Sequence, residues 1–216
     1  MTLSWIEVPD FQPLQASNRG LLTGIYTETK YRRSLAAYVR DYLSEEIINE
    51  AATATRKADA LIRFFETLRF CHGEVYITPT VCWDYAVSAK NVKTYFDIVL
   101  DSLIGYRLYP FHQPRGRQSI SAAHKFYLFD TGVAGHICQR TLKDMNRPEF
   151  GRAFEYFILI KLIGTRSYQE KDHAIKYWHT KSGLKVDFIL GNGGVAIETK
   201  VRVRQGDLQG IWAFRE

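Results

Sequence analysis

Apolar residues recur at helical spacing in the first part of the chain. Between residues 31 and 54 they return every three or four positions, which predicts an amphipathic helix, and the same spacing predicts a second helix over 59–70. Residues 1–29 contain two prolines and two glycines among mixed side chains. We expect only irregular or short elements there, without a core of their own.

A pattern of two short helices and a strand follows. The smaller helix is predicted at 80–85 and the longer one at 91–103, with Ser88 as its N-cap. A short strand is predicted at 108–111. Helix, tight turn, helix and strand is the outline of a winged helix-turn-helix.

The start of the longer helix would then contact DNA. It carries Lys90, Asn91 and Lys93 at the beginning of what would be the recognition helix. A small helical module that packs against another protein explains the same pattern equally well. Both interpretations stay open at this point.

Near the C-terminus, two short runs of β-forming residues flank a break made of glycine and asparagine. The runs cover 185–190 and 195–201, and they predict a β-hairpin that is preceded by another strand at 175–178. We expect Leu190 to pair with Val195 across the four-residue loop. This pairing fixes which side chains face each other on the two strands.

In that register two carboxylates face each other. Asp187 lies opposite Glu198, and Lys185 lies opposite Lys200. Like charges directly opposite each other destabilise a hairpin, so a compensating group is expected. A divalent cation held by both carboxylates is the natural candidate, because Mg²⁺ binds hard carboxylate oxygens.

A third carboxylate lies within a predicted helix that begins at Pro148, runs to about Ile163 and ends at Gly164. Glu155 stands among large apolar residues of this helix. A carboxylate buried in such surroundings needs a cation or hydrogen-bond donors. Arg152, three residues away, could supply that charge. Alternatively, Glu155 joins the two hairpin carboxylates at one metal site.

Composition and charge limit the classes of protein to which the chain could belong. The chain has 216 residues, is 46% hydrophobic and carries a net charge of +6, so we expect a folded protein with an anionic partner, nucleic acid first. A basic protein without such a partner is the plainer alternative. Three cysteines, Cys71, Cys82 and Cys138, show neither CxxC pairs nor an even count, which argues against a disulfide framework or a zinc ribbon. No signal peptide and no membrane-length apolar run occur, so we expect a cytoplasmic protein without a membrane partner.

Several motifs occur in a specific order along the chain: Lys125 to Gly132, Gly151-x-x-Phe154-Glu155, Tyr177 to Gly183, Val186-Asp187-Phe188 and Ile197-Glu198-Thr199-Lys200. The helix glutamate, the strand aspartate and the Glu-x-Lys that follows form the constellation of the PD-(D/E)xK nucleases. Together the motifs resemble the C-terminal region of a prokaryotic family of AAA-type ATPases. In that family a P-loop ATPase is followed by a winged helix and a nuclease-like domain of unknown function.

The resemblance implies a Mg²⁺ site made of Asp187, Glu198 and the backbone carbonyl of Thr199. The metal would lower the pKa of a bound water and stabilise the charge that grows on a phosphate. Lys200 would orient that water, and Glu155 would assist.

The chain also departs from the family pattern. It contains no GxxxxGK[ST], so no ATP is expected to bind to it. Lys185 stands where the family usually has glutamate, and its charge could replace or compete with the metal. Thr199 stands where the family usually has valine, and we expect its side chain to point away from the metal. We also expect the final strand and helix of the family's domain to be absent, so that the chain is a fragment.

These observations predict a mixed α/β protein in three segments. Residues 1–58 would be a remnant of the ATPase tail with a linker helix, 59–112 a winged-helix-like domain and 113–216 a nuclease-like α/β domain. The expected function is Mg²⁺-dependent phosphodiester cleavage of DNA. The alternative is a catalytically silent fragment that binds DNA or a protein, such as a separate ATPase.

Overall fold

A computed structural model describes residues 10–43, 45, 64, 68–69, 72–73, 75–76, 89–112 and 124–215 of the chain. The fold is mixed α/β, as the sequence predicts. The chain divides into two compact units. Unit 1 consists of Met1–Arg107 and Lys125–Lys143, and unit 2 consists of Leu108–His124 and Asp144–Glu216. These units do not coincide with the three segments expected from the sequence, because residues 125–143 group with the N-terminal part of the chain.

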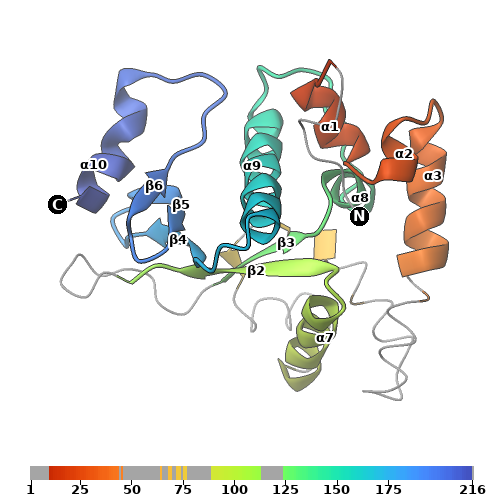
Figure 1. The fold of residues 1–216 in the computed structure, drawn as a ribbon, viewed down its shortest axis with the longest axis horizontal. Helices are drawn as coiled ribbons and strands as arrows, with labels where there is room; N and C mark the ends of the chain where they lie inside the picture. The colour runs from red at the N-terminus through yellow and green to blue at the C-terminus, as the bar shows by residue number, and fades with distance from the viewer. Residues whose placement is uncertain are drawn as a thin grey trace. The chain divides into compact units, whose positions relative to one another are not determined.

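Unit 1 is mainly helical (Figure 1). Its elements, in chain order, are α1 (Pro13–Arg19), α2 (Thr23–Tyr26), α3 (Tyr31–Ala37), the π-helix η2 (Tyr38–Leu43), β1 (Val75–Tyr76), α7 (Ala89–Asp101), the first half of β2 (Gly105–Pro110), nearly all of β3 (His124–Leu128) and α8 (Thr131–Ile137). The strands neighbour one another in the order β1, β3, β2.

The apolar face predicted for the helix at 91–103 is confirmed as far as Val99, whereas Leu103 of the predicted face lies beyond the end of the helix and is 71% exposed. Its side chains at Val92, Tyr95, Phe96 and Val99 are buried in α7. The ring of Phe96 packs edge-on against Phe126 of β3, with ring centroids 5.3 Å apart. The helix ends at Asp101, because the chain turns at 102–103 before β2 begins.

The structure tests the other predictions for the N-terminal part only in part. The helix predicted from residue 31 begins there as α3 and continues as η2 to Leu43; most of its expected remainder lies outside the described residues. The helix predicted at 80–85 lies outside them altogether. The short elements expected before residue 30 are confirmed as α1 and α2. Ala16, Leu21, Leu22 and Ile25 are buried there, with α1 packed against α8.

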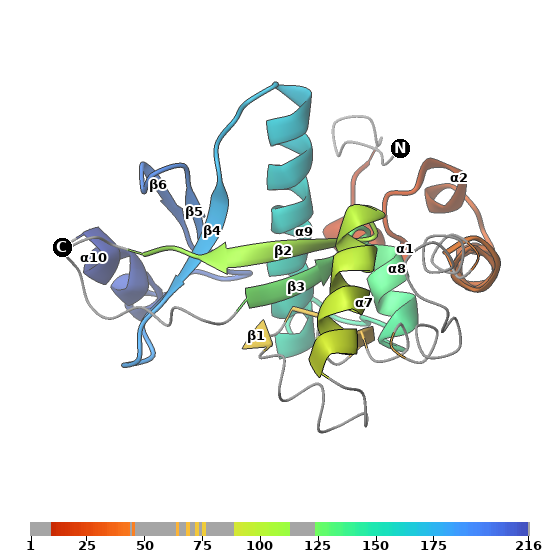
Figure 2. The same ribbon diagram turned by 90° about the horizontal axis from the view of Figure 1, so that it is seen from below.

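One buried aspartate joins α8 to the turn after α1. Asp130 is the N-cap of α8: its Oδ1 accepts hydrogen bonds from the backbone nitrogens of Gly132 at 2.9 Å and Val133 at 3.0 Å. Its Oδ2 accepts a third from the nitrogen of Leu21 at 2.8 Å. A Cβ on Gly20 would lie 2.0 Å from Oδ1 of this carboxylate, so only glycine fits there. Both views of the ribbon accordingly show α1 beside α8 (Figures 1 and 2).

Unit 2 combines a sheet with helices. Its helical elements are α9 (Pro148–Tyr168), the 3₁₀-helix η3 (Gln205–Leu208) and α10 (Gln209–Arg215), and its strands are the second half of β2, β4 (Ile175–His179), β5 (Lys185–Leu190) and β6 (Val195–Ile197). The strands neighbour one another in the order β2, β4, β5, β6. β2 pairs with β4 in parallel, whereas β4–β5 and β5–β6 are antiparallel (Figure 2).

The predicted hairpin is confirmed with its register as far as Ile197. β6 ends there instead of at residue 201, so the predicted cross-strand pairs Asp187–Glu198 and Lys185–Lys200 do not form. Leu190 pairs with Val195 and Phe188 with Ile197, across a turn in which Gly191 and Gly193 have positive φ. The helix predicted from Pro148 also begins there, but it does not end at Gly164. It continues to Tyr168, because a single internal glycine costs a helix only about 1 kcal/mol and no proline follows to stop it.

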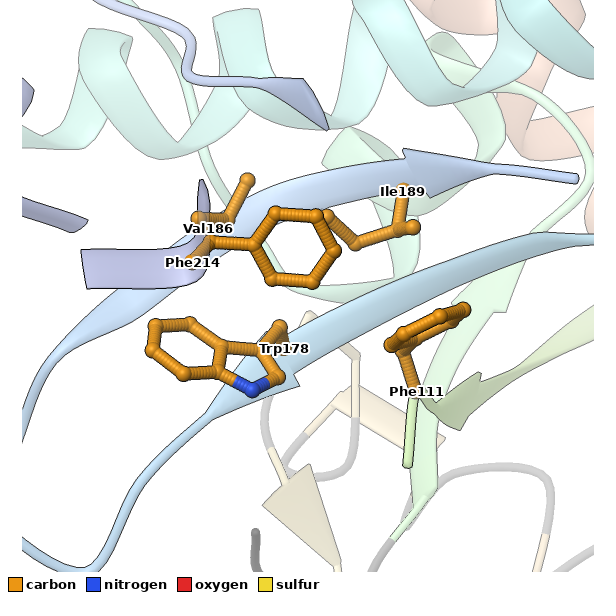
Figure 3. Close-up of a cluster of buried hydrophobic side chains, with 5 residues drawn as sticks. All are labelled: Phe111, Trp178, Val186, Ile189 and Phe214. Atoms are coloured by element: carbon orange, nitrogen blue, oxygen red, sulfur yellow. The ribbon is translucent and has the colours of Figure 1, made fainter. Parts of the chain in front are cut away.

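An apolar cluster holds the hairpin to its neighbours in unit 2. Figure 3 shows its five buried side chains, Phe111, Trp178, Val186, Ile189 and Phe214. Phe214 comes from α10, and its ring centroid lies 5.5 Å from those of both Phe111 and Trp178. A helix therefore follows the Glu-x-Lys segment and packs on the sheet.

The approach of α10 to β5 gives a first testable prediction. A Cβ on Gly210 would lie 1.8 Å from the backbone oxygen of Lys185, so Gly210→Ala must push the helix off the strand. We expect a loss of about 2 kcal/mol in the free energy of unfolding, typical of overpacking. Gly206→Ala is the matched control, since nothing lies within 4 Å of the Cβ it would add. Equal unfolding midpoints in urea for the two variants would contradict this packing.

No helix in the part of the chain that the structure describes is long and apolar enough to cross a membrane.

Candidate functional site

A cleft of about 540 Å³ lies within unit 2. Three segments form its walls: the start of α9, the first residues of β5 and the chain that leaves β6 toward η3. Four residues predicted from the sequence as site residues line it: Glu155, Asp187, Thr199 and Lys200. The fold thus brings the helix glutamate and the strand aspartate to one place, as the constellation predicts.

Asp187 is held by donors of its own unit. Its side chain is only 2% exposed. Its Oδ2 accepts hydrogen bonds from the backbone nitrogen of Thr199 at 2.9 Å and from the hydroxyl of Thr199 at 2.8 Å. Its Oδ1 lies 3.5 Å from Nζ of Lys185. Both oxygens of this carboxylate are therefore engaged.

The side chain of Thr199 does not point away from the site, contrary to the expectation from the sequence. Its hydroxyl donates to Asp187. The reason is local: β6 ends at Ile197, so the alternation of side chains across a strand no longer applies two residues later. The threonine that replaces the family's valine thus adds a hydrogen bond to the aspartate.

Glu198 is paired with Lys200. Its side chain is 7% exposed, and its Oε1 accepts a hydrogen bond from Nζ of Lys200. Its Oε2 is buried and has no hydrogen-bond partner among the described residues. Burial raises the pKa of Glu198 and the charge of Asp187 raises it further, whereas the hydrogen bond from Lys200 opposes the rise.

Lys185 is surrounded by carboxylates. Burial alone would lower its pKa, but the negative charges of Asp187, Glu155 and Glu198 outweigh burial and raise it. Lys185 is therefore charged at neutral pH. The lysine that stands where the family has glutamate serves as a counter-ion to the carboxylates around it.

These donors and acceptors test whether the implied Mg²⁺ fits. Mg²⁺ requires octahedral oxygen ligands at about 2.0–2.1 Å. Both oxygens of Asp187 already accept or face donors, and one oxygen of Glu198 accepts from Lys200. No three His, Cys, Asp or Glu side chains of the described ranges gather closely enough to hold a metal ion. As they stand, the side chains do not fit Mg²⁺, because two lysine ammonium groups take the place that a cation would have.

The cleft is rich in cationic side chains. Among the described residues, six line it, against three carboxylates, which are Glu155, Asp187 and Asp207. The cations are Arg147, Arg152, Lys185, Lys200, Arg202 and Arg204. A surplus of positive charge in a concave surface concentrates anions there.

Sequence reasoning assigned none of the four arginines to the site. Arg152 is considered there only as a counter-charge for Glu155, and the other three are Arg147, Arg202 and Arg204. The only signal for the last two is the alternation of basic residues that begins at Lys200. Arg202 is oriented by a hydrogen bond from its Nη2 to Oδ1 of Asn146, at 2.6 Å.

The residues predicted for DNA contact at 90–93 belong to unit 1. Lys90 and Asn91 lie in the first turn of α7, and their side chains are outside the description. Lys93 is exposed. Their role in DNA binding stays a prediction.

Comparison with known families covers most of the chain. Residues 19–144 match the family described as Domain of unknown function (DUF8612), and residues 150–216 match the one described as Domain of unknown function (DUF4143). The first match therefore covers more than half of the 216 residues. No curated protein and no solved structure matches the chain at a significant level.

Proposed function

The chain belongs to the family described as Domain of unknown function (DUF8612), and from this premise we propose that the cleft of unit 2 binds the phosphate backbone of nucleic acid, DNA first, without cutting it. The observation that carries the proposal is the composition of the cleft wall. Six cationic side chains of the described part of the chain line it, and one of its carboxylates, Asp187, already contacts a lysine of the wall. Phosphate contacts by lysine and arginine supply most of the affinity of sequence-independent binding.

The inner wall supports this role. The charge of Asp187 is offset by Lys185 and its Oδ2 is hydrogen-bonded to Thr199, so this carboxylate repels a phosphate less than an unpaired one would. Arg152 on α9 and Arg204 after β6 contribute guanidinium groups to the cleft. A single guanidinium can donate two parallel hydrogen bonds to two oxygens of one phosphate. The start of α7, with Lys90 and Lys93, would supply a second contact if it reads DNA as a recognition helix.

A partner protein is part of the proposal. Domains of the DUF4143 type are known from contexts associated with AAA-type ATPases. The chain itself contains no phosphate-binding P-loop sequence. We therefore propose that a separate ATPase supplies ATP hydrolysis where this chain acts with one.

The salt dependence of DNA binding tests the proposal. We expect the wild type to bind duplex DNA with an affinity that falls steeply with salt, and Arg152→Gln/Arg204→Gln to weaken binding at least tenfold and to reduce the logarithmic salt slope by about two. Fluorescence anisotropy with a labelled duplex measures both. Lys171→Gln is the control, because Lys171 is exposed in unit 2 but does not line the cleft. Unchanged affinity in the double variant would contradict the role of the cleft.

Mg²⁺-dependent phosphodiester cleavage is the second candidate. One observation favours it: Oε2 of Glu198 is buried and has no hydrogen-bond partner in the described structure, so this oxygen could accept a cation. Calorimetric titration with Mg²⁺ and Mn²⁺ separates the candidates. Binding to the wild type that Asp187→Ala and Glu198→Ala both abolish would favour cleavage. A folded wild type that binds neither ion would favour a cleft that binds nucleic acid without cutting it.

A further inference from the structure

Unit 1 contains a pocket of its own, with a volume of about 290 Å³. The start of α3, the end of α8 and the loop after α8 form its walls. Its polar lining includes Tyr31, Arg32, His136, Gln139 and Arg140, and none of the described residues that line it is acidic. Two guanidinium groups at a polar cavity are the donors that an oxyanion requires.

The backbone holds Arg140 in place. Its nitrogen donates to the oxygen of Gly135 at 2.8 Å, and the preceding Gln139 adopts the left-handed conformation with φ of +50°. On the other side, Asn18 of α1 fixes Leu142 by two hydrogen bonds. The nitrogen of Leu142 donates to Oδ1 of Asn18, and Nδ2 of Asn18 donates to the oxygen of Leu142, both at 2.9 Å. The loop is therefore anchored before and after Arg140, so its backbone is ordered before any ligand binds.

The charge of Arg140 acts on the groups around it. Its Nε and Nη2 atoms are buried. The pKa of His72 is lowered to about 3, mainly by burial and to a smaller extent by the charge of Arg140. The same charge opposes the rise that burial causes in the pKa of Cys138. Arg140 therefore acts on its surroundings as a positive charge.

Arg32 is oriented by an aromatic ring. Its Nε donates to the hydroxyl of Tyr31 at 3.2 Å, and its guanidinium carbon lies 5.8 Å from the centroid of that ring. Arg19 lies over the same ring at 4.8 Å. Arg32 is exposed and forms no ion pair within the described part of the chain, so its two terminal nitrogens can donate to a ligand.

We propose that this pocket binds a phosphate group between Arg32 and Arg140, either as free phosphate or as the phosphate of a small phosphomonoester. Its volume is near the lower end of the range of ligand sites, about 300–1,000 Å³, which suits a small anion rather than a polymer. Tyr31 and Gln139 offer further donors at the rim. The site is distinct from the cleft that we assign to nucleic acid, and neither proposal depends on the other.

Titration of the full chain with inorganic phosphate at constant ionic strength tests the proposal. We expect saturable shifts of two arginine Nε–H signals in NMR spectra, which Arg32→Gln and Arg140→Gln assign. Each of these substitutions should raise the Kd for phosphate at least tenfold. Arg33→Gln is the matched control: Arg33 is exposed on the same helix but does not line the pocket, so its loss should leave the Kd unchanged.

Three results would overturn the proposal. The first is the absence of saturable shifts, and the second is an equal loss of affinity in Arg33→Gln, which would show unspecific attraction. The third is loss of the signal in the cleft variant Arg152→Gln/Arg204→Gln but not in Arg32→Gln, which would place phosphate in unit 2. If Arg140→Gln does not fold, the exposed Arg32 still provides the test. Tighter binding of glycerol phosphate than of phosphate would identify the phosphomonoester as the ligand.

Discussion

Replacement of Asp130 by alanine is expected to destabilise unit 1 by about 4 kcal/mol, a large part of the 5–15 kcal/mol that a domain of this kind has in total. The carboxylate is 2% exposed and accepts hydrogen bonds from three backbone nitrogens, those of Leu21, Gly132 and Val133. Alanine would leave all three donors buried without an acceptor, at about 1–3 kcal/mol each. Urea unfolding followed by circular dichroism measures the loss.

Asparagine at this position separates the two tasks of the carboxylate. Its single amide oxygen can still cap α8, because asparagine is a good N-cap, but its NH₂ group would face the nitrogen of Leu21. We expect Asp130→Asn to lose about half as much as alanine. Asp101→Ala is the control, since Asp101 is exposed at the end of α7 in the same unit. A loss below 1 kcal/mol in Asp130→Ala would mean that water or neighbouring groups satisfy the three donors.

This aspartate also shows what a motif match leaves undecided. Asp130, Thr131 and Gly132 lie in one of the motifs that carry the resemblance to the ATPase family. The hydroxyl of Thr131 donates to the oxygen of Ala16, and a Cβ on Gly132 would lie 2.3 Å from the oxygen of Arg19. The motif thus joins α8 to α1, which are more than 100 positions apart, and no periodicity in the sequence encodes such a contact.

The local parts of unit 2 could be predicted from the sequence. Pro148 at the start of a helix and the glycines between two β-forming runs are short-range signals, and both gave correct elements. The end of α9 was wrong, because one glycine is too weak a signal to stop a helix. The orientation of Thr199 was wrong, because it depends on where β6 stops.

The site was predictable in its carboxylates but less so in its cations. Carboxylates among apolar residues, such as Glu155 and Asp187, are conspicuous because burying them is costly. Arginines such as Arg147 and Arg204 are common on surfaces, and only the fold shows that they line the same cleft. The sequence therefore indicated chemistry at a metal, whereas cationic side chains outnumber carboxylates among the described residues of the cleft wall.

Replacement of Lys200 by alanine is expected to leave the Glu198 carboxylate buried without its cation. The side chain of Glu198 is 7% exposed and that of Lys200 27% exposed, so the pair is largely removed from solvent. Breaking a fully buried pair costs about 3–5 kcal/mol, and we expect about 2 kcal/mol here, since Lys200 is partly solvated. Lys185→Ala is the matched control, because Lys185 is also two residues from its aspartate but is 54% exposed, and we expect a smaller loss.

The loss of stability in Lys200→Ala should depend on pH. The pKa of Glu198 is already raised by burial above its ordinary value of 4.5, and removal of the hydrogen bond from Lys200 raises it further. A raised pKa means that the folded chain binds the proton more tightly than the unfolded chain, so stability falls as the pH rises from 4.5 through the raised value. The variant should therefore be close to the wild type below pH 4.5 and weakest at neutral pH.

The effect of Mg²⁺ on Lys200→Ala tests whether the Glu198–Lys200 pair has replaced a metal site. If Lys200 takes the place of a metal that the site can still bind, millimolar Mg²⁺ should restore the stability of Lys200→Ala at neutral pH by mass action. A cleft that binds nucleic acid without cutting it predicts no such recovery, because Thr199 and Lys185 still engage Asp187 and only one carboxylate has become available. Glu198→Gln/Lys200→Met, which removes both charges, should recover most of the lost stability with or without the ion. Recovery by Mg²⁺ alone would favour phosphodiester cleavage over simple binding.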